Sequence, residues 1–176
     1  MKRCCLVIVE DTSKNKILMV ENKRGMNKGF YNLPGGKIED NETIEDGTVR
    51  ESLEETGIKP INLKTKGKIE FQPVDMLVYV YHTDQFNGEL IEENNETKAF
   101  WIDKENIPYH KMRESDSVWL KEIFEGKIIN KRITYNNDFS INKIENIYEN
   151  IERYKSRYQK FTQLKKNKYL QRNKSL

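Results

Sequence analysis

The segment GGKIEDNETIEDGTVRESLEETGI, residues 35–58, combines a high density of acidic residues with glycines near both ends. Eight of its 24 residues are Asp or Glu. A helix is predicted from about Thr43 to Thr56, because Thr43 can cap its first turn and Gly57 can end it in the left-handed conformation. The segment therefore reads as a glycine-containing loop that leads into an acidic helix.

One face of this predicted helix is electrostatically unfavourable. Helical geometry brings Glu51, Glu54 and Glu55 together, and three like charges at this spacing repel one another. Gly47 projects onto the same face, although an interior glycine costs about 1 kcal/mol relative to alanine. A bound divalent cation would remove the repulsion, and the glycine would let a ligand approach; carboxylate oxygens of this kind suit Mg²⁺ or Mn²⁺. A solvated acidic face explains the spacing equally well but leaves the preceding glycines unexplained.

The rest of the chain favours a mixed α/β domain. Val49 and Leu53 are expected to turn the other side of the acidic helix toward a core. A glycine-rich loop is predicted over 23–37, a turn at Asn87-Gly88, and a short helix over 115–126 that starts at Ser115 or Asp116. Strands are predicted at 4–9, 16–22, 68–71, 76–83, 98–102 and 127–135.

The last part of the chain differs in charge and periodicity. Apolar residues recur every three or four positions from Ile141 to Leu164, which predicts an amphipathic basic helix. Residues 151–176 carry nine Lys or Arg and one Glu. We therefore expect a domain over 1–140 and a basic helix and tail over 141–176. The first expectation is that this helix docks on the domain or on a second subunit, and a contact with nucleic acid or another anionic surface is the alternative.

Cysteine content and the first residues suggest a reducing compartment. The only cysteines are the adjacent Cys4 and Cys5, whose pairing would be strained. The apolar run that contains them is too short for a membrane span or a signal sequence. The expectation is a cytoplasmic protein with no membrane partner.

The acidic segment resembles a known sequence motif. Gly36, Glu42 and the run RESLEETGI over 50–58 have the spacing of the Nudix box, with Ser52 at a position where the family prefers an apolar residue. Beyond the box, residues 4–140 are similar to the MutT-type purine nucleoside triphosphatases of this family. The resemblance implies an α/β/α sandwich around a mixed β-sheet. It also implies Mg²⁺-dependent hydrolysis, with Mn²⁺ as a substitute, of a nucleoside diphosphate linked to another group.

The resemblance assigns catalytic roles residue by residue. Glu51, Glu54 and Glu55 correspond to metal ligands, together with the carbonyl of Gly35. Glu96 corresponds to a remote acidic residue that completes the metal site or acts as base, with Glu92 and Glu93 as rivals. Glu51 and Glu96 are the candidates for the base, and Arg50 is expected to orient a glutamate.

Substrate contacts follow from the same resemblance. Asn32 and Asp116 correspond to residues that hydrogen-bond a purine, although a turn Asn and a helix-capping Asp explain them equally well. Gly36, Lys23 and Lys37 are candidates for phosphate contacts, although a solvated side chain is the commoner case for either lysine. Arg113 and Ser115 stand at positions where the resemblance implies a stacking Trp and a second Asp, so the range of bases is left open.

The resemblance leaves three hypotheses for the function. The first is hydrolysis of oxidised purine nucleoside triphosphates, such as 8-oxo-dGTP, to the monophosphate and pyrophosphate, which sanitises the nucleotide pool and supports DNA repair. The second is removal of pyrophosphate from RNA 5′ ends, with the basic tail holding RNA. The third is a non-catalytic nucleotide-binding module, which the three intact glutamates argue against. Monomer and dimer are equally compatible with the sequence.

Overall fold

The computed structural model describes residues 1–25 and 27–147. These residues form a series of strands and two α-helices, α1 (Ile44–Thr56) and α2 (Glu114–Phe124). Short 3-10 turns at Lys104–Asn106 and Tyr109–Lys111 precede α2. The strands are β1 (Lys2–Asp11), β2 (Lys16–Asn22), β3 (Tyr31–Asn32), β4 (Ile58–Ile61), β5 (Lys64–Gln72), β6 (Met76–Thr83), β7 (Gln85–Gly88), β8 (Thr97–Asp103), β9 (Ile129–Tyr135) and β10 (Ile141–Asn146).

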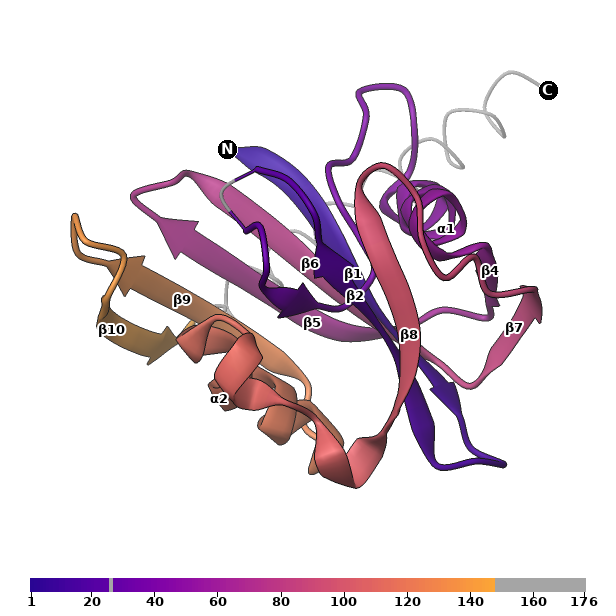
Figure 1. Cartoon of the computed structure of the whole chain (residues 1–176). Coiled ribbons are helices and arrows are strands. Elements are labelled where there is room, and N and C mark those ends of the chain that lie inside the picture. The colour runs from indigo at the N-terminus through magenta and orange to yellow at the C-terminus, as the bar shows by residue number, and fades with distance from the viewer. Residues whose placement is uncertain (26, 148–176) are drawn as a thin grey trace, which may run out of the picture. The chain divides into compact units, whose positions relative to one another are not determined.

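The main sheet is mixed, as expected (Figure 1). Its eight strands include the path β10-β9-β5-β6-β1-β2-β3, and β8 also pairs with β2. The β1–β6 and β5–β9 pairs are parallel, and the other pairs of this sheet are antiparallel. A separate two-stranded sheet pairs β4 with β7.

Successive side chains of the central strands point to opposite faces of the sheet, where they belong to two separate hydrophobic clusters. In β1, Ile8 belongs to the cluster that includes Trp119, Leu120 and Ile123 of α2. Val7 and Val9 belong to the other cluster, which contains Ile58 of β4 and is flanked by Ile44 of α1. The sheet therefore has one helix on each face, which confirms the expected α/β/α sandwich.

The core-facing side of α1 is small and polar rather than aliphatic. Its buried residues are Gly47, Thr48, Ser52 and Thr56, whereas Leu53 is 45% exposed and Val49 only partly buried. The three buried hydroxyls each donate to a backbone carbonyl, from Thr48 to Ile44, from Ser52 to Ile58 and from Thr56 to Ser52. The prediction that Val49 and Leu53 face the core was wrong, because short hydroxyl side chains with satisfied hydrogen bonds let the helix lie close to the sheet.

Three further expectations are corrected. Ile141–Asn146 form β10, antiparallel to β9, so the expected helix does not begin at Ile141; its remainder, 148–176, lies outside the described residues. Asn87 and Gly88 are not a turn but part of β7, opposite Lys59 and Ile58. The residue that precedes α2 is Arg113, so neither Ser115 nor Asp116 caps this helix.

Candidate active site

The loop over residues 34–38 lies along the start of β1 and faces α1. The amides of Cys5 and Val7 donate to the carbonyls of Gly36 and Pro34 (both 2.9 Å). A side chain on Gly35 would overlap the backbone of β1, and one on Gly36 would overlap the carboxylate of Glu51. Glycine at these two positions therefore lets the loop pack on β1 and lets the Glu51 carboxylate rest against backbone.

Arg50 forms hydrogen bonds with three acidic residues of this region. Its guanidinium donates to Glu42 through Nε (3.0 Å) and Nη2 (2.6 Å). Nη1 donates to Glu51 (2.9 Å) and Glu54 (3.1 Å), and Nη2 also reaches the carbonyl of Lys37 (3.0 Å). Arg50 holds the pKa of Glu42 down at about 2, mainly through these hydrogen bonds. The expected orienting role of Arg50 agrees with this geometry, although the side chain of Lys37 is exposed and only its carbonyl takes part.

The three helix glutamates differ in their surroundings. Burial raises the pKa of Glu51, whose side chain is 17% exposed, and raises the pKa of Glu55 to about 7. Glu55 also accepts a hydrogen bond from the amide of Gly35 (2.9 Å). The side chain of Glu54 is 60% exposed. Two carboxylates are thus held in a site where a negative charge is unfavourable without a cation.

Gly47 has a different role from the one expected. A Cβ at this position would lie 2.6 Å from Cδ1 of Ile38 and 2.7 Å from Oε1 of Glu42. The space beside Gly47 is therefore filled by these two side chains rather than left for a ligand. The glycine lets Glu42 reach Arg50.

The loop over residues 91–97 lies against the end of α1. The amide of Ile91 donates to the carbonyl of Thr56 (2.8 Å). The side chain of Asn94 donates to the carbonyls of Glu54 (3.2 Å) and Glu55 (3.0 Å), and the hydroxyl of Thr97 also donates to Glu55 (3.0 Å). This loop carries Glu96, so the structure brings the remote acidic residue to the same end of the helix as Glu54 and Glu55.

Glu96 and Lys23 are engaged with other partners. Arg24 forms an ion pair with Glu96, and the backbone amide of Lys23 donates to the carbonyl of Glu96 (2.8 Å). The ammonium of Lys23 contacts Glu93 (2.7 Å) and the carbonyl of Asn94 (2.6 Å). Both basic residues therefore link the glycine-rich loop to the loop that carries the candidate base.

The donor set of this region fits Mg²⁺ or Mn²⁺ in chemical type. Glu51, Glu54, Glu55 and Glu96 supply carboxylate oxygens, and raised pKa values at Glu51 and Glu55 indicate a site that a cation would stabilise. Within residues 1–25 and 27–147, no three side chains already converge as a ready coordination sphere. Glu51 and Glu54 are instead bonded to Arg50, and Glu96 is paired with Arg24.

The two residues expected to recognise a purine lie on other elements. Asn32, in β3, accepts the amide of Leu33 on its side-chain oxygen (2.8 Å). Asp116, in α2, is 8% exposed and accepts the indole N–H of Trp119 (3.0 Å). Burial raises the pKa of Asp116 to about 6. A carboxyl with such a pKa gains or loses its proton near neutral pH, so it can act as a hydrogen-bond donor when protonated and only as an acceptor when ionised.

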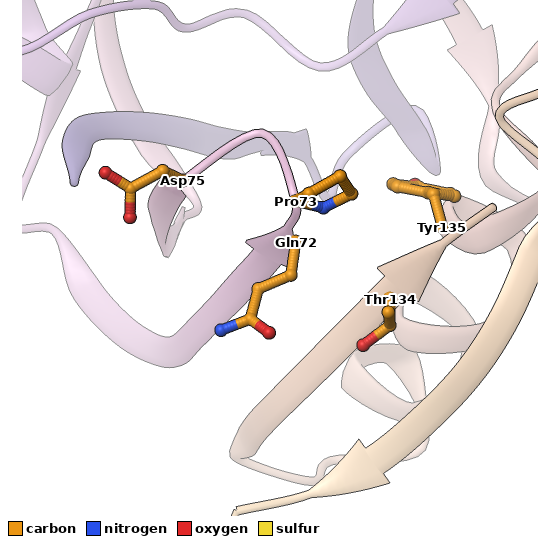
Figure 2. Close-up of a pocket in the computed structure, with 5 residues that line it drawn as sticks. All are labelled: Gln72, Pro73, Asp75, Thr134 and Tyr135. Atoms are coloured by element: carbon orange, nitrogen blue, oxygen red, sulfur yellow. The ribbon is translucent and has the colours of Figure 1, made fainter. Parts of the chain in front are cut away.

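A pocket of about 320 Å³ is lined by Gln72, Pro73, Asp75, Thr134 and Tyr135 (Figure 2). Of these residues, Tyr135 is linked to Asp116 by two hydrogen bonds through Ser115. The hydroxyl of Tyr135 shares a hydrogen bond with Ser115 (2.8 Å), and Ser115 in turn contacts Asp116 (3.4 Å). The ring of Tyr135 stacks on Phe71, with centroids 6.0 Å apart. Tyr135 was not singled out in the sequence, where an aromatic at a strand end reads as core.

Two cationic side chains connect the segment before α2 to the glycine-rich loop. The guanidinium of Arg113 lies over the ring of Phe30 (4.2 Å) and donates to Asn27 through Nη2 (2.8 Å). The ammonium of Lys111 lies over the ring of Tyr31 (4.8 Å). Arg113 thus stacks on an aromatic ring of the protein, at the position where the sequence resemblance implied a stacking Trp.

Comparison with known proteins identifies the family. Residues 2–123 match the NUDIX domain family. The chain belongs to the Nudix family. It is 32% identical over 126 residues to an oxidized purine nucleoside triphosphate hydrolase of Danio rerio, which covers 69% of this chain and 80% of that protein. The protein of the same name from Mus musculus is 34% identical over 116 residues, or 64% of this chain and 74% of that protein.

Solved structures agree with the Nudix fold. A crystal structure of the MutT protein from Bacillus halodurans superimposes with a TM-score of 0.70 and covers 82% of this chain and 97% of that one, at 24% identity. A MutT Nudix hydrolase from Burkholderia pseudomallei gives a TM-score of 0.61 at 22% identity. The chain is accordingly a Nudix hydrolase of nucleotide substrates, with its box residues in α1 and in the loop that precedes it. In the part of the chain that the structure describes, no helix is long and apolar enough to cross a bilayer.

Proposed function

We propose that this Nudix hydrolase cleaves purine nucleoside triphosphates, including oxidised forms such as 8-oxo-dGTP, into a monophosphate and pyrophosphate with the help of Mg²⁺. Nucleotide-pool sanitisation, and through it DNA repair, is the cellular role that follows. The names of the fish and mouse relatives support the substrate class. Two free thiols, Cys4 and Cys5, support a reducing compartment such as the cytoplasm.

The observation that carries the proposal is the group of carboxylates at the C-terminal half of α1. Glu51 and Glu55 are held in partly buried positions by the glycine backbone of the preceding loop, with pKa values raised by burial. The last turn of α1 contains no basic residue, and a helix C-terminus disfavours negative charge. Carboxylates that are partly buried near a helix C-terminus are electrostatically unfavourable. A function that requires a bound cation at this place would explain why the protein has them there.

Glu51, Glu54 and Glu55, with Glu96 and the carbonyl of Gly35, are the groups that would hold the cation. A bound divalent ion would neutralise phosphate oxygens and lower the pKa of a water molecule. Arg50 keeps Glu51 and Glu54 close together before the ion binds. Glu51 and Glu96 are the two candidates for the base that takes the proton of the attacking water.

The remaining candidates would bind the substrate. Gly36, whose backbone lies against the Glu51 carboxylate, would contact a phosphate, and Lys23 and Lys37 would supply positive charge. Asp116 and Asn32 would form hydrogen bonds with the edge of a purine base. Asp116 is buried and has a raised pKa, so its carboxyl could be protonated or ionised. The protonated form would donate a hydrogen bond to the base and the ionised form would only accept one, so the two forms would select different purine edges.

The experiment is a panel of nucleoside triphosphates assayed with Mg²⁺ for pyrophosphate and for orthophosphate separately. The panel contains dGTP, 8-oxo-dGTP, dATP, 2-oxo-dATP and a pyrimidine triphosphate, and substrates are ranked by kcat/KM. The proposal predicts pyrophosphate as product and an oxidised purine at the top of the ranking. Orthophosphate as the main product, or a preference for a pyrimidine, would contradict it.

A second candidate is an RNA 5′-end pyrophosphohydrolase. Nine Lys or Arg in residues 151–176 favour it, because basic segments bind nucleic-acid phosphates. The NAD-capped RNA hydrolase NudC of Vibrio cholerae is 32% identical over 103 residues, but these cover only 38% of that protein. Adding triphosphorylated and NAD-capped RNA to the panel tests this candidate directly.

A further inference from the structure

The C-terminal end of α1 is completed by a different part of the chain. The last four carbonyls of an α-helix have no partner within the helix. In α1 the carbonyl of Leu53 accepts the amide of Gly57 (2.9 Å), and the carbonyls of Glu54, Glu55 and Thr56 accept donors from residues 91–97. The loop therefore acts as the cap for the turn that carries two of the metal-binding candidates.

Asn94 makes most of these connections. Its side-chain nitrogen donates to the carbonyls of Glu54 (3.2 Å) and Glu55 (3.0 Å). Its side-chain oxygen accepts the amides of Glu96 and Thr97 (both 2.8 Å). One amide group thus uses its donors on the helix and its acceptor on the loop, and both sides of this connection carry candidate metal ligands.

The electrostatic setting makes this connection important. Glu54 and Glu55 place two negative charges at the negative end of the helix dipole, and the last turn has no basic residue. Unless its carbonyls are bonded, this turn is the part of α1 that would open first. The Asn94 amide and the Thr97 hydroxyl supply the donors that a basic side chain would otherwise supply.

We propose that Asn94 is a positioning residue of the active site, which fixes the last turn of α1 against the loop that carries Glu96 so that carboxylates from two separate segments can bind one cation. This inference rests on the proposed function. Asn94 touches neither the substrate nor the ion in this account, and it acts through the backbone of Glu54, Glu55 and Glu96. Residues that orient metal ligands in this way typically contribute 10-fold to 100-fold to metal affinity.

The test compares Mn²⁺ binding by the full-length protein and three variants, measured by electron paramagnetic resonance of the free ion. Asn94→Ser keeps an oxygen that can accept the loop amides but is too short to reach the helix carbonyls. Thr97→Val removes the hydroxyl contacts with the carbonyl of Glu55 and with the side-chain oxygen of Asn94 (3.3 Å), and it preserves the shape of a residue that is 1% exposed. Gln85→Ala is the matched control, since Gln85 also forms an amide hydrogen bond, to Asn62, but on β7.

The expected result is a Mn²⁺ dissociation constant raised about tenfold in Asn94→Ser, raised less in Thr97→Val and unchanged in Gln85→Ala. Nucleotide hydrolysis by Asn94→Ser should fall at low Mn²⁺ and recover as Mn²⁺ is raised. A residue that only stabilised the fold would lower the melting temperature and would not give this recovery.

Unchanged Mn²⁺ affinity in both Asn94→Ser and Thr97→Val, whatever their melting temperatures, would overturn the inference and leave the proposed function standing. If Asn94→Ser does not fold, Thr97→Val decides the question alone. A wild-type protein that binds no Mn²⁺, or binds it equally well after Glu54→Gln, would remove the proposed function and this inference together.

Discussion

Arg50 holds Glu42 through two hydrogen bonds, one from Nε (3.0 Å) and one from Nη2 (2.6 Å) to the two carboxylate oxygens. The same guanidinium uses Nη1 for Glu51 and Glu54. Glu42 precedes α1 and lies eight residues before Arg50 in sequence, so the pair joins the start of the helix to Glu51 and Glu54. Because a planar guanidinium offers fixed directions, the contact with Glu42 sets the angle from which Nη1 reaches the other two.

Replacing Arg50 with Lys should lower kcat/KM about tenfold or more. An ammonium preserves the charge but cannot make two parallel bonds to Glu42 and a third contact with the glutamates. Steady-state hydrolysis of the best substrate checks this. The control is Arg132→Lys, because Arg132 of β9 also donates through Nε and Nη2 to one glutamate, Glu70 of β5, although both bonds go to the same oxygen (2.9 and 2.7 Å). Equal activities in the two variants would contradict an orienting role for Arg50.

Gly47→Ala should separate activity from stability. Alanine favours the helix by about 1 kcal/mol, which offsets the crowding of its methyl group against Ile38 and Glu42. The melting temperature should therefore change little, whereas displacement of Glu42 from Arg50 should lower kcat/KM. Thermal melting and kinetics on the same sample measure both effects. Full activity in Gly47→Ala would show that Glu42 moves aside without consequence.

The acidic helix and its caps were predictable because the relevant signals are local. Thr43 caps α1 through the amide of Asp46, and Gly57 ends it with φ of 74°. The core-facing side of α1 was not predictable in this way. Apolar periodicity assigned Val49 and Leu53 to the core, whereas tight packing on the sheet selects Thr48, Ser52 and Thr56. Ser52, which departs from the family pattern, is fully buried and bonded to Ile58.

Features that the sequence analysis assigned wrongly or missed are determined by contacts between segments that are distant in sequence. Ile141–Asn146 have the apolar spacing of a helix, but pairing with β9 makes them a strand. Asn94 carried one local signal, since an Asn often bonds the backbone amides that follow it. Its bonds to Glu54 and Glu55 join residues about 40 positions apart, and a single sequence does not contain that information.

Glu54→Gln should nearly abolish Mg²⁺-dependent pyrophosphate release while the fold is retained. The side chain of Glu54 is 60% exposed, so the free energy of unfolding should change by no more than about 0.5 kcal/mol. Glu125→Gln is the matched control, because Glu125 is also 60% exposed and pairs with Lys127 away from α1. Pyrophosphate release and urea unfolding are the two measurements. A normal rate in Glu54→Gln would take this residue out of the metal site.

Asp116 should make stability depend on pH below neutrality. Burial raises its pKa from 3.8 to about 6, so between pH 4 and 6 the folded state binds more protons than the unfolded state. The free energy of unfolding therefore falls as pH rises through this window, by up to about 3 kcal/mol, and the loss is complete above pH 6.

Asp116→Asn should remove that dependence. Asparagine keeps an oxygen that can accept the indole N–H of Trp119 but does not titrate. Urea unfolding of both proteins at several values between pH 4 and 7 gives the difference, in which titration of other groups cancels. Asp116→Ala should be less stable than the wild type by about 1–3 kcal/mol at pH 4, because Trp119 loses its acceptor, and this difference should shrink as pH rises because only the wild type loses stability through Asp116. Parallel pH curves for the wild type and Asp116→Asn would contradict the raised pKa.

Truncation after Ile147 should separate the two candidate functions. Residues 148–176 contain nine Lys or Arg and two Glu, and their removal leaves β10 in place. Triphosphate hydrolysis should survive, whereas activity on RNA 5′ ends, if present, should fall and lose its salt dependence. Truncation after Ser140 is the comparison, because it also removes β10 and Asn146, a hydrogen-bond partner of the buried Lys131 (2.9 Å). The shorter protein should be less stable, so a loss of nucleotide hydrolysis seen only there reflects the fold and not the basic tail.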